Sequence, residues 1–136
     1  MRVNTRFLFL ALPLTACIND LGSRPLYGTW GGAAGSVVAT SGGMSISTAC
    51  GAVASTNRVV NVDGSGRFSI HGELRGFDNS FRDTLPLPPV LPALISGSVT
   101  GDQIMASIQF MAGVHADTLV FDGRRGQPPG EPVICG

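Results

Sequence analysis

Apolar and polar residues alternate along several short stretches of the chain after residue 26. In "GRFSIHGELR" the two faces differ sharply, with Phe68, Ile70, Gly72 and Leu74 on one and Arg67, Ser69, His71, Glu73 and Arg75 on the other. The same period places together Met44, Ile46, Thr48 and Cys50, then Ile104, Ala106, Ile108 and Phe110, and then Leu119 and Phe121. A period of two is typical of an antiparallel strand with one buried face.

Short segments rich in Gly and Asp separate these stretches. They read "TSGGM", "VDGSGR", "VTGDQ" and "FDGRRG", and each suits a tight hairpin turn or a bulge. The sequence offers no convincing amphipathic helix in this region. We therefore expect an all-β domain over residues 26–136, built as a small antiparallel up-and-down β-barrel of seven or eight strands, because closure removes exposed sheet edges.

One connection departs from this pattern. Residues 76–92, "GFDNSFRDTLPLPPVLP", contain Pro86, Pro88, Pro89 and Pro92, which cannot donate to a β-ladder. The apolar residues in and after this loop suggest that it packs over one end of the barrel as a structural plug. A binding lid or a surface for a partner is the alternative, and disorder is the third.

The first 16 residues have the features of an export signal. Arg2 and Arg6 precede an uncharged, apolar run over residues 7–14, which is too short to span a bilayer. Small residues follow, and "LTAC" ends at Cys17. This tetrapeptide resembles the lipobox of bacterial lipoproteins, although an ordinary cleaved secretory leader is the alternative.

The lipobox resemblance implies that residues 1–16 are removed and that Cys17 carries diacylglycerol, with a further acyl chain such as palmitate on its amino group. Several acyl chains anchor a protein stably. Residues 17–25 then form a short lipidated tether. Because Ile18 stands where many inner-membrane lipoproteins have aspartate, the resemblance favours the outer membrane, on its periplasmic or surface face.

Charge excludes some classes of partner. The chain has nine basic and nine acidic residues, and loss of Arg2 and Arg6 leaves seven basic against nine acidic. Arg124 and Arg125 form the only adjacent basic pair, so we expect no binding to nucleic acid.

Cys50 and Cys135 are the two cysteines left after the anchor. In an oxidising compartment an even pair indicates a disulfide, which would restrain the unfolded chain by about 4.5 kcal/mol in the loop-closure estimate. Two buried free thiols are the alternative. A metal site would need nearby ligands that the sequence does not offer.

Trp30, in "YGTWGG", is the only tryptophan, and its simplest role is to seal one end of the barrel. The Gly-x-Trp resembles the opening motif of calycins, in which the tryptophan packs against a late arginine. Arg124 or Arg125 could supply that arginine, and we assign it to Arg124. Much of the chain also resembles a group of small, uncharacterised bacterial lipoproteins and secreted proteins. The resemblance rests on "WGG", "DGSGRF", "SGSVTGD", Cys50 and Cys135, and it implies no activity.

No catalytic motif is present, and the only histidines are His71, on a polar strand face, and His115, expected in a hairpin turn. "NVDGSG" imitates the start of a calcium loop, but Gly72 stands where the loop needs glutamate, so a hairpin turn is the better interpretation. We therefore expect no metal, no cofactor and no enzymatic activity.

The sequence predicts a lipid-anchored, non-enzymatic cell-envelope barrel that binds an envelope protein or has a structural role. A carrier of a small apolar ligand in the barrel interior is one alternative. The other is a protein-binding barrel like the small lipoprotein-type inhibitors of metalloproteases, although residues 18–25, "INDLGSRP", would hold the required trunk near the membrane.

Overall fold

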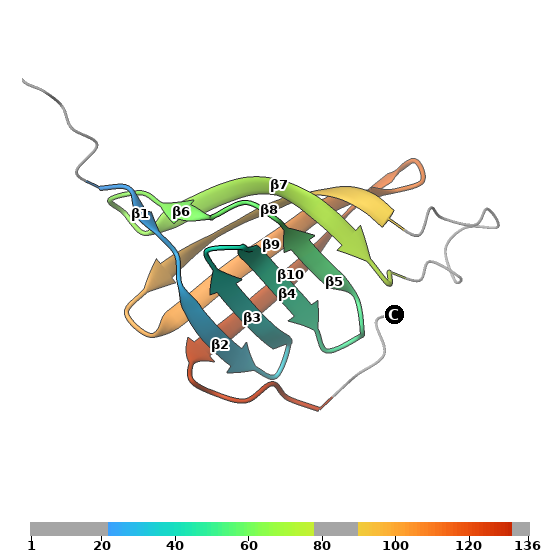
Figure 1. Ribbon diagram of the computed structural model, residues 1–136. Coiled ribbons are helices and arrows are strands. Elements are labelled where there is room, and N and C mark those ends of the chain that lie inside the picture. Colours follow the sequence, from blue (N-terminus) through green and yellow to red (C-terminus); the bar gives the residue numbers. More distant parts are fainter. Residues whose placement is uncertain (1–21, 78–89, 132–136) are drawn as a thin grey trace, which may run out of the picture.

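A computed structural model describes residues 22–77 and 90–131, and Figure 1 shows their arrangement. The described residues form ten strands and no helix. They are β1 (Arg24–Pro25), β2 (Gly28–Gly32), β3 (Gly35–Thr40), β4 (Gly43–Thr48), β5 (Val53–Thr56), β6 (Asn61–Val62), β7 (Arg67–Arg75), β8 (Val90–Thr100), β9 (Gln103–Ala112) and β10 (His115–Arg125).

Eight of these strands close into an antiparallel barrel in the order β10-β2-β3-β4-β5-β7-β8-β9 (Figure 1). Chain neighbours pair with each other around the barrel, apart from the excursion through β6 and the closing contact between β10 and β2. The expected fold class, a small all-β up-and-down barrel, is confirmed. Closure leaves no free first or last strand, which is the physical advantage that favoured a barrel over an open sheet.

The period-two pattern sets which side chains face the interior. Along β7 the predicted apolar face is the buried one, with Phe68 and Leu74 almost fully enclosed, and the alternate residues are exposed. In β9 the alternation is complete from Gln103 to Ala112. The largest fully buried side chains are Trp30, Phe121, Ile46, Leu74, Ile95, Ile104, Ile108, Val37, Val60 and Val62.

Three of the four expected turns are turns in the structure. They fall at Ser41–Gly42, Gly64–Ser65 and Gly101–Asp102, between consecutive strands. Gly101 has φ of 57°, a left-handed conformation that glycine adopts without strain.

The hairpin between β6 and β7 is held by the side chain of Asp63. Its Oδ1 accepts hydrogen bonds from the Ser65 N–H at 2.9 Å, the Ser65 hydroxyl at 2.8 Å and the Arg67 N–H at 3.0 Å. The hydrogen bond from the Arg67 N–H, followed by that from the Ser65 hydroxyl, lowers the pKa of the Asp63 carboxyl below its ordinary value of 3.8. The segment that imitated a calcium loop is therefore a hairpin turn with an ordered aspartate.

The fourth expected turn, "FDGRRG", is wrong, because β10 continues through it to Arg125. Gly123 serves close packing here. A Cβ at this position would lie 2.7 Å from the Phe121 ring and 2.9 Å from the Gly31 carbonyl oxygen of β2. Gly123 is therefore required for close packing between β10 and β2, where the barrel closes, and not for a turn.

The boundaries of the proline-rich connection also need correction. Residues 90–92, placed in the loop, belong to β8, and Leu91 is buried in the core. Pro92 is tolerated because the ladder between β8 and β9 starts one residue later, at Ala93, so its missing N–H interrupts no hydrogen bond there. Pro86, Pro88 and Pro89 lie outside the described residues, so the plug and its alternatives stay predictions.

β1 and β6 form a separate two-stranded ladder beside the barrel (Figure 1). Arg24 pairs with Val62 and Pro25 with Asn61, and the Leu26 N–H donates to the Val60 carbonyl at 2.8 Å. The last two residues of the expected tether are therefore paired with β6, beside the barrel.

Candidate functional site

Trp30 occupies the interior at the end of the barrel where β10 meets β2. Its side chain is fully buried, as expected of a residue that seals the barrel. The guanidinium carbon of Arg125 lies over the ring, 4.5 Å from its centroid. Arg125 Nη1 also donates to the Tyr27 carbonyl oxygen at 3.1 Å, so the arginine spans the space between the indole and the chain entering β2.

The assignment of the tryptophan's partner to Arg124 was wrong, because Arg125 takes that place. Strand register explains this: Arg125 pairs with Trp30, whereas Arg124 pairs with Gly31. Directly opposite residues share a face of the sheet, so Arg125 lies on the face of the indole and Arg124 on the other. Sequence alone cannot fix this register, and a shift of one residue exchanges the two arginines.

The indole N–H of Trp30 is buried and has no hydrogen-bond partner among the described residues. A buried donor without an acceptor costs about 1–3 kcal/mol. Trp30 is thus held by apolar contacts and by the arginine over its face, which must outweigh this cost.

The interior contains large apolar side chains along the whole length of the described strands. They come from β2, β4, β7, β8, β9 and β10, and the bulkiest are 0–6% exposed, namely Trp30, Ile46, Phe68, Leu74, Leu91, Ile95, Ile104, Ile108, Phe110 and Phe121. At the end opposite Trp30, the rings of Phe77 and Phe110 pack edge to face with centroids 4.7 Å apart. An eight-stranded barrel is just wide enough for side chains to fill it.

Cys50 lies in the turn after β4, at the end of the barrel away from Trp30. Its Sγ is 3.1 Å from the Thr48 hydroxyl, and the neighbouring Ala49 N–H donates to the Ala34 carbonyl at 2.8 Å. The Gly130 N–H donates to the Gly32 carbonyl at 2.7 Å, which brings the chain after β10 to this same end. Cys135 lies outside the described residues, so the disulfide stays a prediction.

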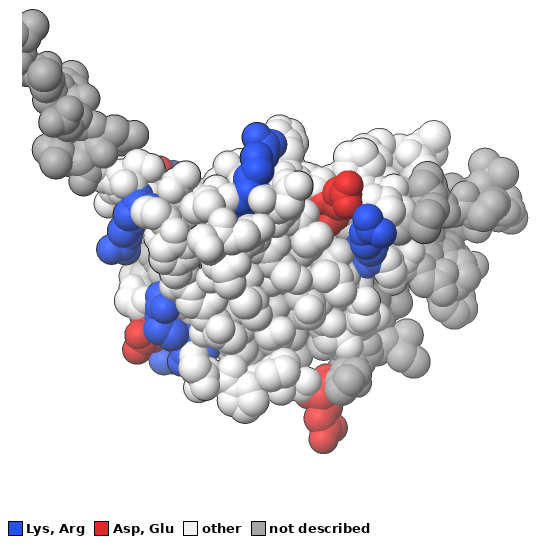
Figure 2. All heavy atoms as spheres, viewed as in Figure 1, with Lys and Arg blue, Asp and Glu red and all other residues white. Residues whose placement is uncertain are grey.

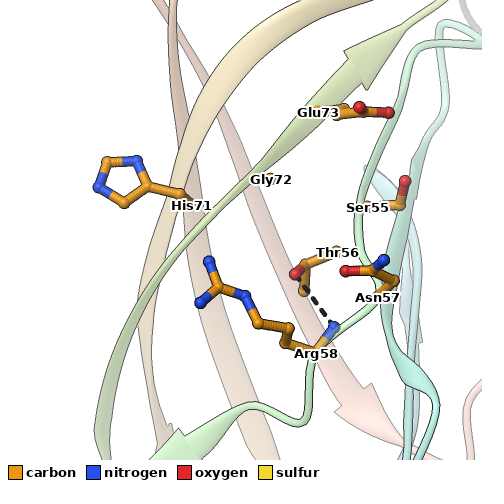
Figure 3. A pocket seen from close by; sticks show the side chains of 7 residues that line it. All are labelled: Ser55, Thr56, Asn57, Arg58, His71, Gly72 and Glu73. Carbon is orange, nitrogen blue, oxygen red and sulfur yellow. Dashed lines mark hydrogen bonds between the residues drawn. The ribbon is translucent and has the colours of Figure 1, made fainter.

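A polar hollow opens on the barrel wall where β5 and β7 separate (Figure 3). Its volume is about 310 Å³, and it is lined by Ser55, Thr56, Asn57, Arg58, His71, Gly72 and Glu73. The hollow exists because β5 pairs with only three residues of β7, from Arg75 to Glu73, and the chain then turns away toward β6. Figure 3 shows the Arg58 side chain reaching from this departing segment toward β7.

The charged groups of this hollow differ in their partners. Glu73 Oε2 accepts from Arg75 Nη2 at 3.2 Å, and both side chains are more than half exposed. Arg58 makes no ion pair with any described residue, and neither does His71. The hollow therefore contains one unpaired guanidinium beside a neutralised carboxylate.

A second, shallower hollow of about 490 Å³ lies beside the chain entering β1. Ser23, Asn61 and Arg67 contribute to its walls. It lies next to the ladder of β1 and β6.

The surface carries few charges. On the face shown in Figure 2, the few charged side chains lie among uncharged residues, and some acidic groups have basic groups beside them. Large exposed apolar side chains gather on the hairpin of β9 and β10, at Met105, Met111, Val114 and Val120.

Neither histidine lies in a recognisable catalytic arrangement within the described ranges. His71 projects from the exposed face of β7, as expected, and His115 is the exposed first residue of β10 rather than part of the preceding turn, which is Gly113–Val114. No group of three His, Cys, Asp or Glu residues in residues 22–77 and 90–131 could hold a metal ion. No helix in these ranges is long and apolar enough to cross a membrane.

Sequence reasoning missed the hollow between β5 and β7. No motif in the sequence marks Ser55, Asn57 and Arg58. Their grouping depends on where the β5 ladder ends against β7, which is a property of register and not of local sequence. Cys17, with the expected leader, lies outside the described residues.

No family model, curated protein or solved structure matches this chain. Its function must therefore be inferred from its own residues and geometry.

Proposed function

We propose that this protein is a lipid-anchored β-barrel of the cell envelope that serves as a non-enzymatic binding or structural module. The observation that carries the proposal is the leader ending in "LTAC", with two arginines, a short apolar run and Cys17 in order. The anchor is expected in the outer membrane, with the barrel on its periplasmic or surface face.

The geometry of the tether is compatible with this arrangement. Arg24 and Pro25 are already paired with β6, so only a few residues separate Cys17 from the barrel wall. The proposed anchor would therefore hold the barrel close to the lipid surface, with the ladder of β1 and β6 on the membrane-proximal side.

The buried interior supports a binding or structural module over the carrier alternative. Bulky side chains such as Trp30, Phe68 and Phe121 occupy the space that an apolar ligand would need. A partner would then be recognised on the outer surface, where the hollow between β5 and β7 lies.

The comparison with metalloprotease inhibitors is less well supported. Such an inhibitor would insert its N-terminal trunk into a protease cleft, but here the end of that trunk, Arg24–Pro25, is paired with β6. Its remaining residues would be confined between the barrel and the membrane.

The experiment that tests the anchor compares Cys17→Ser with the unmodified chain in a bacterial host supplied with labelled palmitate. We expect the unmodified chain to incorporate label and fractionate with outer membranes. Cys17→Ser should incorporate none and lose its membrane association.

Cys50→Ser is the matched control, because it removes a different cysteine and leaves the lipobox intact. It should retain the label. Equal labelling of Cys17→Ser and the unmodified chain would refute the lipid anchor.

A further inference from the structure

β7 has one edge that is only partly paired. Toward β8 its ladder is continuous over nine residues, from Arg67 to Arg75. On the opposite edge the ladder with β5 covers only Glu73–Arg75, and the Arg67 carbonyl accepts from the Asp63 N–H at 2.9 Å. Between these two attachments the edge of β7 faces the hollow.

The direction of the backbone groups along this edge follows from the hydrogen bonds at its two ends. In an antiparallel strand the N–H and C=O of one residue point to the same side, and the side alternates with each residue. The N–H and C=O of Arg67 both point toward the β6 hairpin. Because the ladder with β8 is unbroken, those of His71 point to the same side, into the hollow.

His71 has no backbone partner there. The next residue of the chain opposite it would be Asn57, but residues 57–60 turn away, and no backbone hydrogen bond joins them to His71. An open segment of strand edge is a template for pairing with another extended chain. Ser69, whose backbone groups point the same way, also has no backbone partner among the described residues, whereas Arg67 and Glu73 beyond these two residues are paired, so the open edge is short.

We propose that this recess, between Asn57–Arg58 and the His71 edge of β7, binds a short extended segment of a partner protein that adds as a strand to β7 and carries an acidic side chain facing Arg58. Backbone hydrogen bonds provide the affinity in this mode of recognition, and flanking side chains provide the specificity. The unpaired Arg58 guanidinium supplies the charge complementarity, because Glu73 is already neutralised by Arg75. This inference rests on the binding role proposed above but is independent of the lipid anchor.

The recess also argues against a second copy of this chain as the occupant. Pairing two β7 edges would require both to be open along several residues, yet β5 and the β6 hairpin flank the opening in each copy. A single extended peptide needs only the opening itself, and the volume of about 310 Å³ suits a segment of a few residues.

The test uses the full chain in detergent micelles and a synthetic library of acetylated, amidated pentapeptides with aspartate or glutamate at the centre and all residues at the other positions. Binding is measured by NMR at peptide concentrations of a few mM, because a few net backbone hydrogen bonds correspond to a dissociation constant of the order of 1 mM. We expect binders that shift the amide resonances of Asn57, Arg58 and His71. Hydrogen exchange of the His71 amide should slow on binding, while that of Ile70, which points to β8, should not change.

Two matched comparisons test the backbone pairing and the contribution of Arg58 separately. Methylating the peptide backbone nitrogens should abolish binding without altering any side chain. Arg58→Gln should weaken binding of acidic peptides by about two- to fivefold, the effect of one exposed ion pair, and should not weaken peptides with glutamine at the centre. Arg75→Gln is the control for loss of a nearby arginine outside the recess, and it should weaken neither set.

Absence of any binder in the library, binding that tolerates backbone methylation, or shifts confined to other surfaces would overturn the proposal. Dimerisation of the chain through β7, detected by light scattering, would also overturn it. None of these outcomes depends on whether Cys17 is acylated.

Discussion

At the scale of single residues, Trp30 illustrates what a sequence pattern can and cannot specify. Its place at the start of the first barrel strand, and its burial there, were predicted from "YGTWGG". The arginine that covers it was not, because the choice between two adjacent arginines depends on the pairing of β10 with β2.

Replacing Trp30 with alanine should remove about 3–5 kcal/mol from the free energy of unfolding, the usual range for an aromatic side chain deleted from a core. Denaturant titration measures this loss. Tyr27→Ala is a suitable control, because Tyr27 is an aromatic residue that is 51% exposed, and its removal should change stability little. In the unmodified protein, tryptophan emission should be blue-shifted and poorly quenched by iodide; readily quenched emission would contradict the buried indole.

Arg125→Ala should destabilise the barrel by about 0.5–1 kcal/mol, because it removes an exposed cation from the face of Trp30. Arg124→Ala deletes an equally charged, exposed neighbour that does not lie over the ring, and it should have a smaller effect. The two variants are compared by thermal and denaturant unfolding. A larger loss for Arg124→Ala would refute the assignment of the stacking residue.

Asp63 should make the stability of the protein depend on pH. Its pKa is lower in the folded state than in the unfolded chain, so its contribution is fully present above the unfolded pKa of 3.8 and is lost as the pH falls through the lower folded value. Asp63→Ala should therefore reduce stability at neutral pH, and the difference from the unmodified protein should shrink in acid. Denaturant unfolding of both proteins at a series of pH values measures this difference, and an equal loss at neutral and acidic pH would contradict the role of the Asp63 carboxylate.

At the scale of elements, alternation predicted the buried faces of β7 and β9 correctly because a strand has a fixed period of two. The glycine-rich segments were not all turns, contrary to the prediction from the sequence. "VDGSGR" is a turn, whereas "FDGRRG" continues a strand, since glycine serves both tight turns and close strand contacts. Propensity gives the same signal for both, and only the position of the neighbouring strand separates them.

The segment after β10 is attached to β2, and this attachment bears on the predicted disulfide between Cys50 and Cys135. It runs beside β2, where a Cβ on Gly31 would lie 2.7 Å from Pro128 backbone atoms, and Gly130 is hydrogen-bonded to Gly32. Ala34, two residues after Gly32, is hydrogen-bonded to Ala49, the residue before Cys50. From Gly130, five further residues lead to Cys135, and extended chain covers at most about 3.3–3.6 Å per residue.

We therefore expect Cys50 and Cys135 to form one intramolecular disulfide. In a Cys17→Ser background, the denatured but unreduced protein should show no reactive thiol, and reduction should release two. Reduction should also lower stability by about 2–5 kcal/mol, the usual cost of removing a disulfide from a small secreted domain. Two reactive thiols before reduction would contradict the bridge.

At the scale of the whole molecule, the barrel and the proposed anchor meet at the ladder of β1 and β6. Because Arg24 and Pro25 are paired with β6, only residues 18–23 separate Cys17 from this ladder. Its position fixes which end would face the lipid, and the open edge of β7 lies on the same side of the barrel as β6 (Figure 1).

The sequence by itself determined the fold class, the buried faces of the strands and most hairpins, because these depend on local alternation and on the backbone preferences of glycine and aspartate. Only the tertiary structure decided the closure of β10 on β2, the selection of Arg125, the inclusion of Pro92 in β8 and the hollow between β5 and β7. Each of these depends on the register between strands that are distant in the sequence or on the point where a ladder ends. The local sequence indicates neither the register nor the end of a ladder. A shift of one residue leaves the sequence pattern unchanged but changes which residues lie opposite each other.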